Sequence, residues 1–182
     1  MKKHFSFILV ACMAALVMTS CNKKNEPTPP EPDLKPVAAG IQFTATFAQQ
    51  TLDQCDISFD YYDENGNKKN EVVNTPEWTK TVETKALPST LGFHWNIAVK
   101  ADLDTTKYDK FLLDYNFSYF SVAINAAGAA VSEKHGTLGF GNKIEMAMSK
   151  RQATVDILLE HNPINFLHKY DAEGKFTEDE WK

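Results

Sequence analysis

The chain has 182 residues, of which 43% are hydrophobic and 24% charged, and this composition is ordinary for one soluble domain with an appendage. Its net charge is −5, and it falls to −7 without residues 1–20, which hold two lysines and no acid. Proteins bind nucleic acid by neutralising phosphates with clustered Lys and Arg. No such cluster occurs in this acidic chain, so nucleic acid is excluded as a partner.

The first twenty residues are predicted to form an export signal. Lys2 and Lys3 precede an apolar run of 14 residues, Phe5–Met18, and small polar residues follow it. This run is shorter than the roughly 20 residues that a helix needs to span a bilayer, and no later segment approaches that length. We therefore expect residues 1–20 to be a cleaved signal peptide and no segment to span the membrane permanently.

Residues 18–21, Met-Thr-Ser-Cys, resemble the bacterial lipobox, in which signal peptidase II cuts just before a cysteine. The sequence departs from the family pattern at Met18, where leucine is usual. The resemblance implies a diacylglyceryl group on the sulfur of Cys21 and a further acyl chain, such as palmitate, on its amino group. Because each buried methylene contributes about 0.8 kcal/mol, two or three chains hold a protein firmly. Cys21 is thus expected to anchor the protein; an ordinary secretory leader, cut elsewhere, is the alternative.

A proline-rich segment follows this cysteine. Residues 22–36 contain five of the eight prolines and almost no apolar side chains. Such segments favour extended polyproline II, at about 3.1 Å per residue, so this one is long enough to hold a domain roughly 45 Å from the membrane. Residues 21–36 are therefore predicted to be a lipidated cysteine and its tether.

Cys55 is the thiol that remains once Cys12 is cleaved off and Cys21 is acylated, so no disulfide within the chain is expected. Free cysteine is among the most buried residue types. We interpret Cys55 as a small buried side chain at the start of a strand rather than as a nucleophile.

From Val37 onward apolar and polar residues alternate with a period of two, which is typical of half-buried strands. This pattern predicts strands at residues 41–47, 55–61, 69–74, 78–84 and 91–99. Between the second and third strands, Asn65-Gly66 predicts a tight primed hairpin turn. A calcium loop is the alternative there, but Tyr61 occupies the position of its first aspartate ligand.

The aromatic segment 108–124 fits both a helix and a strand. Four apolar residues match helical spacing and five match strand alternation, and the aromatic enrichment also favours a strand. After Tyr119 the apolar phase shifts, which indicates either a one-residue bulge or burial of both faces.

The last third of the chain is predicted to close the sheet. Alternation predicts a hairpin of strands 144–148 and 153–159 around a polar turn at 149–152, followed by a partly packed tail at 161–182. In all, seven to nine short strands without a long helix predict an all-β fold, an antiparallel β-sandwich of immunoglobulin-like or transthyretin-like type over residues 37–160. A small barrel is the alternative.

A lipobox, a short polar tether and a single acidic β-sandwich domain together resemble the small lipoproteins that gut Bacteroidota export. This resemblance implies attachment to the outer membrane. Residues 22–25, Asn-Lys-Lys-Asn, lack the acids that usually follow the cysteine of surface-exported members, so both sides of that membrane stay open. Asp104-Thr105-Thr106 matches the short motif at which these bacteria O-glycosylate exported proteins, which implies a sugar on Thr105.

No local catalytic motif occurs in the sequence. There is no G-x-S-x-G elbow, H-E-x-x-H zinc pair, phosphate-binding glycine loop or C-x-x-C pair. His161 and His168 lie seven residues apart, but no third and fourth ligand is spaced to complete a metal site. We therefore expect a protein that is not an enzyme and that holds no cofactor or metal.

Aromatic residues beyond the core pattern are the candidate ligand-binding residues. Tyr62 adjoins Tyr61 and Tyr119 adjoins Phe120, so one ring of each pair must point away from the face that the other occupies, and Trp181 lies near the chain's end. The alternative is burial on both faces, with Trp181 as a lid. The sequence thus favours a lipid-anchored binding or adhesion module for a glycan or protein. An accessory subunit that docks on an envelope protein by a strand edge, a hydrolase and an enzyme inhibitor are the alternatives.

Overall fold

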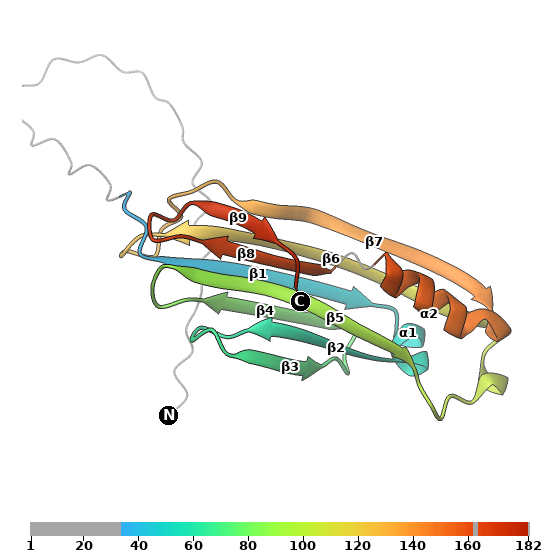
Figure 1. Ribbon diagram of the computed structural model, residues 1–182. Coiled ribbons are helices and arrows are strands. Elements are labelled where there is room, and N and C mark those ends of the chain that lie inside the picture. The colour runs from blue at the N-terminus through green and yellow to red at the C-terminus, as the bar shows by residue number, and fades with distance from the viewer. Residues whose placement is uncertain (1–33, 162–163, 182) are drawn as a thin grey trace, which may run out of the picture. The chain divides into compact units, whose positions relative to one another are not determined.

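The computed structural model describes residues 34–161 and 164–181, of which residues 137–140 are described by their backbone alone (Figure 1). The predicted signal peptide, Cys21 and most of the predicted tether lie outside the described residues.

Nine strands in the described residues form two antiparallel sheets that pack face to face, so the predicted antiparallel β-sandwich is confirmed. The four-stranded sheet has the order β4 (Glu77–Glu83), β1 (Ala38–Phe47), β6 (Lys110–Ile124) and β7 (His135–Ala147). The five-stranded sheet has the order β3 (Lys68–Val72), β2 (Cys55–Tyr62), β5 (Ser89–Val99), β8 (Asn165–Tyr170) and β9 (Phe176–Asp179). The helical segments are α1 (Gln49–Gln54), η1 (Thr105–Lys107), η2 (Met148–Lys150) and α2 (Arg151–Glu160).

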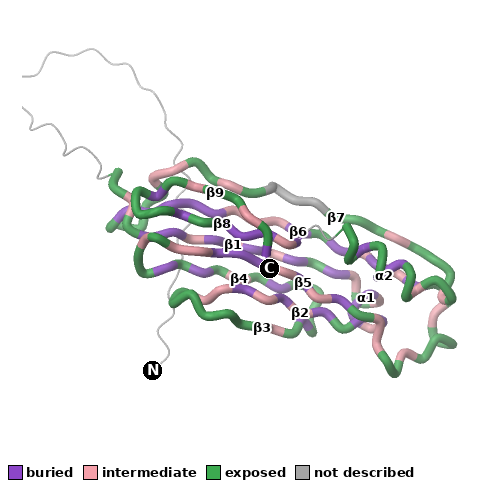
Figure 2. The backbone as a smooth tube through the Cα atoms, in the orientation of Figure 1, coloured by how far each residue is buried: buried purple, intermediate pink, exposed green. Residues whose placement is uncertain are grey.

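Aromatic side chains join the two sheets. Phe43 of β1 stacks on Phe93 of β5 with ring centroids 4.7 Å apart, and Trp78 of β4 stacks on Phe59 of β2 at 4.6 Å. Figure 2 shows buried residues along the strands of both sheets. Because a buried aromatic side chain contributes about 1.5–3 kcal/mol, these cross-sheet pairs are a main source of cohesion.

Turns of the same type connect the strands of three hairpins, β2–β3, β6–β7 and β8–β9. Each turn begins with Asp or Asn and has Gly three residues later, at 63–66, 125–128 and 171–174, and the glycine φ angles are 76–78°. In each, the first side chain accepts two backbone N–H groups. The first turn closes by the bond from Asp63 N–H to Asn67 O, so its loop is one residue longer than the tight primed turn that Asn65-Gly66 predicts.

Strand β6 confirms the preference for a strand over a helix in the aromatic segment. The β6–β7 register shifts between Phe117 and Tyr119, and the extra residue lies on β7, because β6 keeps a constant register with β1. The phase shift within β6 therefore comes from burial of both faces, which includes all residues from Ser121 to Ile124.

The predicted strand at 153–159 is wrong, because this segment forms the helix α2. Its buried side chains Val155 and Leu158 are three residues apart, whereas Ile157, which the alternation assigns to the core, is 59% exposed. Ala, Arg, Gln, Leu and Glu dominate the segment and favour a helix. Over the part of the chain that the structure describes, no helix has both the length and the apolar character to cross a membrane.

The segment 161–182 is not a partly packed tail. It supplies β8 and β9, and β8 lies inside the five-stranded sheet between β5 and β9. Its alternating residues Phe166, His168 and Tyr170 are buried. The polar His168 in this row hides the strand pattern from a test based on hydrophobicity.

Candidate functional site

Tyr62 and Trp181 lie against each other on the outer face of the five-stranded sheet. Strand alternation turns Tyr61 into the core and Tyr62 outward at the end of β2. Trp181 follows β9, and its ring centroid lies 4.7 Å from that of Tyr62. Because Trp181 is only 8% exposed, the pair does not form an open aromatic platform.

Two further side chains enclose Trp181. Lys68, directly opposite Tyr62 on β3, places its Nζ 4.7 Å from the centre of the Trp181 ring. The ring of His94 on β5 lies 6.4 Å from that of Trp181 and within 15° of parallel. These contacts fit the alternative expectation, in which Trp181 covers the face as a lid.

A row of polar side chains continues this face beside Trp181. Asp60 accepts hydrogen bonds from Asn70 Nδ2 at 2.8 Å and from Asn96 Nδ2 at 3.1 Å. His94 Nδ1 and Asn165 Oδ1 belong to directly opposite residues of β5 and β8, and both atoms are buried without a hydrogen-bond partner among the described residues. Because an unpaired buried atom costs about 1–3 kcal/mol, both atoms would gain from a hydrogen bond to water or to a ligand.

A hollow of about 760 Å³ adjoins Tyr62 at the end of the sandwich that carries the hairpin turns. It lies between the turn 63–66 and the loop 84–88, which joins β4 to β5. Ser89 lines it, and Ser89 Oγ is a third buried atom without a partner in the described part of the chain. The hollow is further lined by Thr90, Lys169, Tyr170, Asp171 and Thr177.

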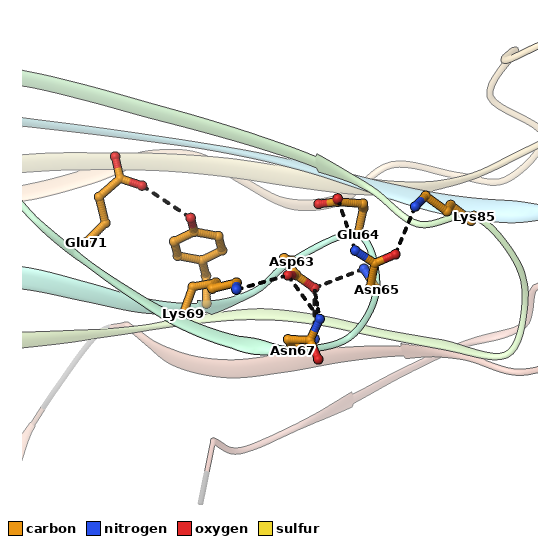
Figure 3. A network of polar contacts seen from close by, with 8 residues as sticks. Asp63, Glu64, Asn65, Asn67, Lys69, Glu71 and Lys85 are labelled. Atoms are coloured by element: carbon orange, nitrogen blue, oxygen red, sulfur yellow. Dashed lines mark hydrogen bonds and ion pairs between the residues drawn. The ribbon is translucent and has the colours of Figure 1, made fainter.

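Hydrogen bonds fix one wall of this hollow (Figure 3). Asp63 Oδ1 accepts the backbone N–H groups of Asn67 and Asn65 at 2.8 and 2.9 Å. These bonds, with that of Asn67 first, hold the pKa of Asp63 below its ordinary value. Lys85 Nζ donates to Asn65 Oδ1 at 2.9 Å and so ties the loop 84–88 to the turn. The Asp63 carboxylate therefore stabilises the turn that forms this wall of the hollow.

Tyr119, the third predicted ligand-binding residue, lies apart from Tyr62 and Trp181. Its ring packs between the sheets and stacks on Phe166 of β8, with centroids 4.2 Å apart. Burial, with a smaller contribution from the charge of Glu178, raises the pKa of its hydroxyl. The structure thus brings together two of the three predicted residues.

Thr105 is exposed in η1, between β5 and β6. Asp104 caps this turn, since its Oδ1 accepts the backbone N–H of Thr106 at 3.0 Å and the hydroxyl of Thr106 at 2.6 Å. The hydroxyl of Thr105 is therefore carried on an ordered, accessible turn. Glycosylation there and lipidation of Cys21, which lies outside the described residues, stay predictions.

A buried Ser–His contact is a feature that sequence reasoning missed. Ser121 Oγ hydrogen-bonds His168 Nδ1 and also lies 2.9 Å from the hydroxyl of Tyr170. Burial, with a contribution from His135, lowers the pKa of His168 to about 4. Ser121 and His168 are 0% and 1% exposed, so no substrate reaches them and the contact is a structural network. The alternation of His168 with Phe166 and Tyr170 was the available signal.

Cys55, His161 and His168 are likewise not grouped into a catalytic or metal-binding site. Cys55 is buried, and burial raises its pKa to about 12, which keeps the thiol protonated. His161 is exposed after α2 whereas His168 is buried in β8. Over the described ranges, no three His, Cys, Asp or Glu side chains are grouped as metal ligands.

Comparisons with known proteins identified no relative of this chain. The chain matches no protein-family model, no curated protein and no solved structure.

Proposed function

We propose that the protein is a lipid-anchored, non-catalytic binding module of the bacterial outer membrane and that its ligand is a glycan. The observation that carries this proposal is the hollow beside Tyr62, which is lined by this aromatic ring and by polar side chains. Ligand sites typically have volumes of 300–1,000 Å³ and a few fixed polar groups, and the hollow of about 760 Å³ is within this range.

The chemistry of the lining favours a sugar over an apolar ligand. Hydroxyl and amide groups of the lining and of the adjacent polar row suit the many hydroxyl groups of a glycan. The half-buried ring of Tyr62 offers an apolar face at the mouth, against which a sugar ring can stack.

Binding of soluble residues 22–182 to a panel of oligosaccharides tests this function. We expect a measurable affinity for at least one glycan and a loss of about tenfold, or about 1.4 kcal/mol, in Tyr62→Ala. Tyr108→Ala is the matched control, because Tyr108 is also half-buried but lies beside η1 and bonds Asp53. Equal binding by Tyr62→Ala and wild type, or no binding to any glycan, would contradict the proposal.

A further inference from the structure

Trp181 covers a surface that does not match it chemically. Its indole lies against Tyr62 and His94, at the edge of a polar row on the outer face of the five-stranded sheet. His94 Nδ1 and Asn165 Oδ1 in that row are buried and unpaired among the described residues. The indole has one N–H donor and no acceptor, and it bonds neither atom, whereas water or hydroxyl groups can serve both, so the covered state leaves them unsatisfied.

The contacts of charged groups that hold this ring are weak ones at the surface. We call residues 180–181 the strap. The strap follows Asp179, whose carboxylate pairs with Lys169 Nζ at 2.5 Å, but both side chains are more than 40% exposed. Lys68, whose Nζ lies over the indole, is exposed as well. Exposed ion pairs and cation–π contacts contribute little to stability, so burial of the indole, worth about 1.5–3 kcal/mol, is the main interaction that opposes release of the strap.

We infer that Trp181 holds the place of a sugar ring and that the glycan displaces the strap when it binds. This inference rests on the proposed function and extends its site from the hollow across the polar row. The incoming sugar stacks on Tyr62, and two of its hydroxyl groups hydrogen-bond Asn165 Oδ1 and His94 Nδ1. These two atoms are suited to neighbouring hydroxyls, because opposite residues of paired strands have Cβ atoms about 4.5–5.5 Å apart.

Glycan affinity in strap variants tests the displacement. The probes are neutral oligosaccharides of glucose, galactose and mannose. We expect Trp181→Ala and a chain that ends at Asp179 to bind the preferred probe about tenfold more tightly than wild type, because neither has to release the indole. Glu180→Ala, the matched control in the same strap, should bind like wild type. Weaker binding by Trp181→Ala would overturn the inference and leave the proposed function standing, whereas no binding by any variant would overturn both.

A stability measurement without ligand tests whether the strap leaves a buried polar atom unpaired. In the full chain, Asn165→Leu removes a buried unpaired oxygen and should raise the Tm by about 2–4 °C. In the chain that ends at Asp179 this gain should vanish, because the β8–β9 register, with Leu167 opposite Asp179, continues to Asn165 beside Trp181, and removal of Trp181 opens the oxygen to water. Asn70→Leu is the control, since Asn70 Nδ2 is paired with Asp60 and Ser58 and its loss should give no gain. An equal gain from Asn165→Leu in both chains would contradict the role of the strap.

Discussion

At the scale of single residues, several polar side chains in the core bond one another, whereas Trp95 Nε1 has no partner among the described residues. Ser121, His168 and Tyr170 form a buried chain of hydrogen bonds among aromatic rings. In one neutral tautomer Nδ1 accepts from the Ser121 hydroxyl, and in the other Nδ1–H donates to Ser121 Oγ. Burial disfavours the charged ring and lowers the pKa of His168 to about 4, so His168 is neutral in the folded chain near pH 7. His135 and Glu178 are the other titratable groups that face this part of the core.

The lowered pKa of His168 predicts a pH dependence of stability. The pKa of His168 is about 4 in the folded chain and 6.5 ordinarily, so between these values the unfolded chain binds a proton that the folded chain does not. The free energy of unfolding should therefore be fully supported above pH 6.5 and fall by at most about 3 kcal/mol as the pH drops through pH 4. Urea titrations at pH 7.5, 5.5 and 4.5 measure this fall. His168→Phe should lose its share of the fall, whereas His161→Gln, at an exposed histidine, should keep it; identical pH profiles for all three would contradict the assignment.

At the scale of elements, helix α1 substitutes for a strand. Strand β1 pairs with β6 as far as Phe47 opposite Tyr115. Beyond that point, Thr51 and Gln54 side chains bond the β6 backbone instead: Gln54 Oε1 accepts the N–H of Leu112 at 2.8 Å, and Thr51 Oγ1 accepts that of Asp114 at 2.9 Å. Six helical residues thereby satisfy backbone groups that would otherwise be left unpaired at the end of the sheet.

Gln54→Ala should accordingly destabilise the fold by about 2–4 kcal/mol, since it leaves the buried N–H of Leu112 without a partner and opens a cavity. Chemical denaturation measures the loss, and hydrogen exchange should show faster exchange at the Leu112 amide. Gln49→Ala, on the exposed face of the same helix, should change the stability by less than about 0.5 kcal/mol. Similar stabilities for the two variants would show that α1 does not act as a substitute strand.

The limits of prediction from the sequence lie in the same elements. Alternation predicted most strands, because the residues they bury, such as Phe43 and Trp95, are apolar. It failed where the core uses polar groups, as at Gln54 and His168, whose burial depends on partners more than 45 residues away in the chain. It also failed at α2, where ten residues are too few to separate helical from strand spacing. In the candidate site, the Tyr62–Trp181 contact is non-local, so the sequence supplied the residues without their pairing.

At the scale of the whole molecule, the chain enters the sandwich at the end that carries the three hairpin turns (Figure 1). Pro36 packs against Gly174 of the last turn, and the backbone N–H of Val37 bonds Ile124 O at 2.8 Å. The hollow beside Tyr62 lies at this end, whereas η1, with Thr105, lies at the other (Figure 1). The described chain therefore begins at the end of the sandwich that carries the hollow, and Thr105 lies at the other end.

The anchor itself can be tested on the full chain in its native envelope. Two or three acyl chains bind a membrane firmly, since each buried methylene contributes about 0.8 kcal/mol, whereas the acidic protein has no charge attraction to anionic lipid. Cys21→Ala should therefore move the exported protein from the membrane fraction to the soluble fraction and remove the lipid mass from its N-terminus. Cys55→Ala is the control, because Cys55 is buried in the domain and should leave the fractionation unchanged. If Cys21→Ala stays with the membrane and the native protein carries no lipid mass, Cys21 is not the anchor.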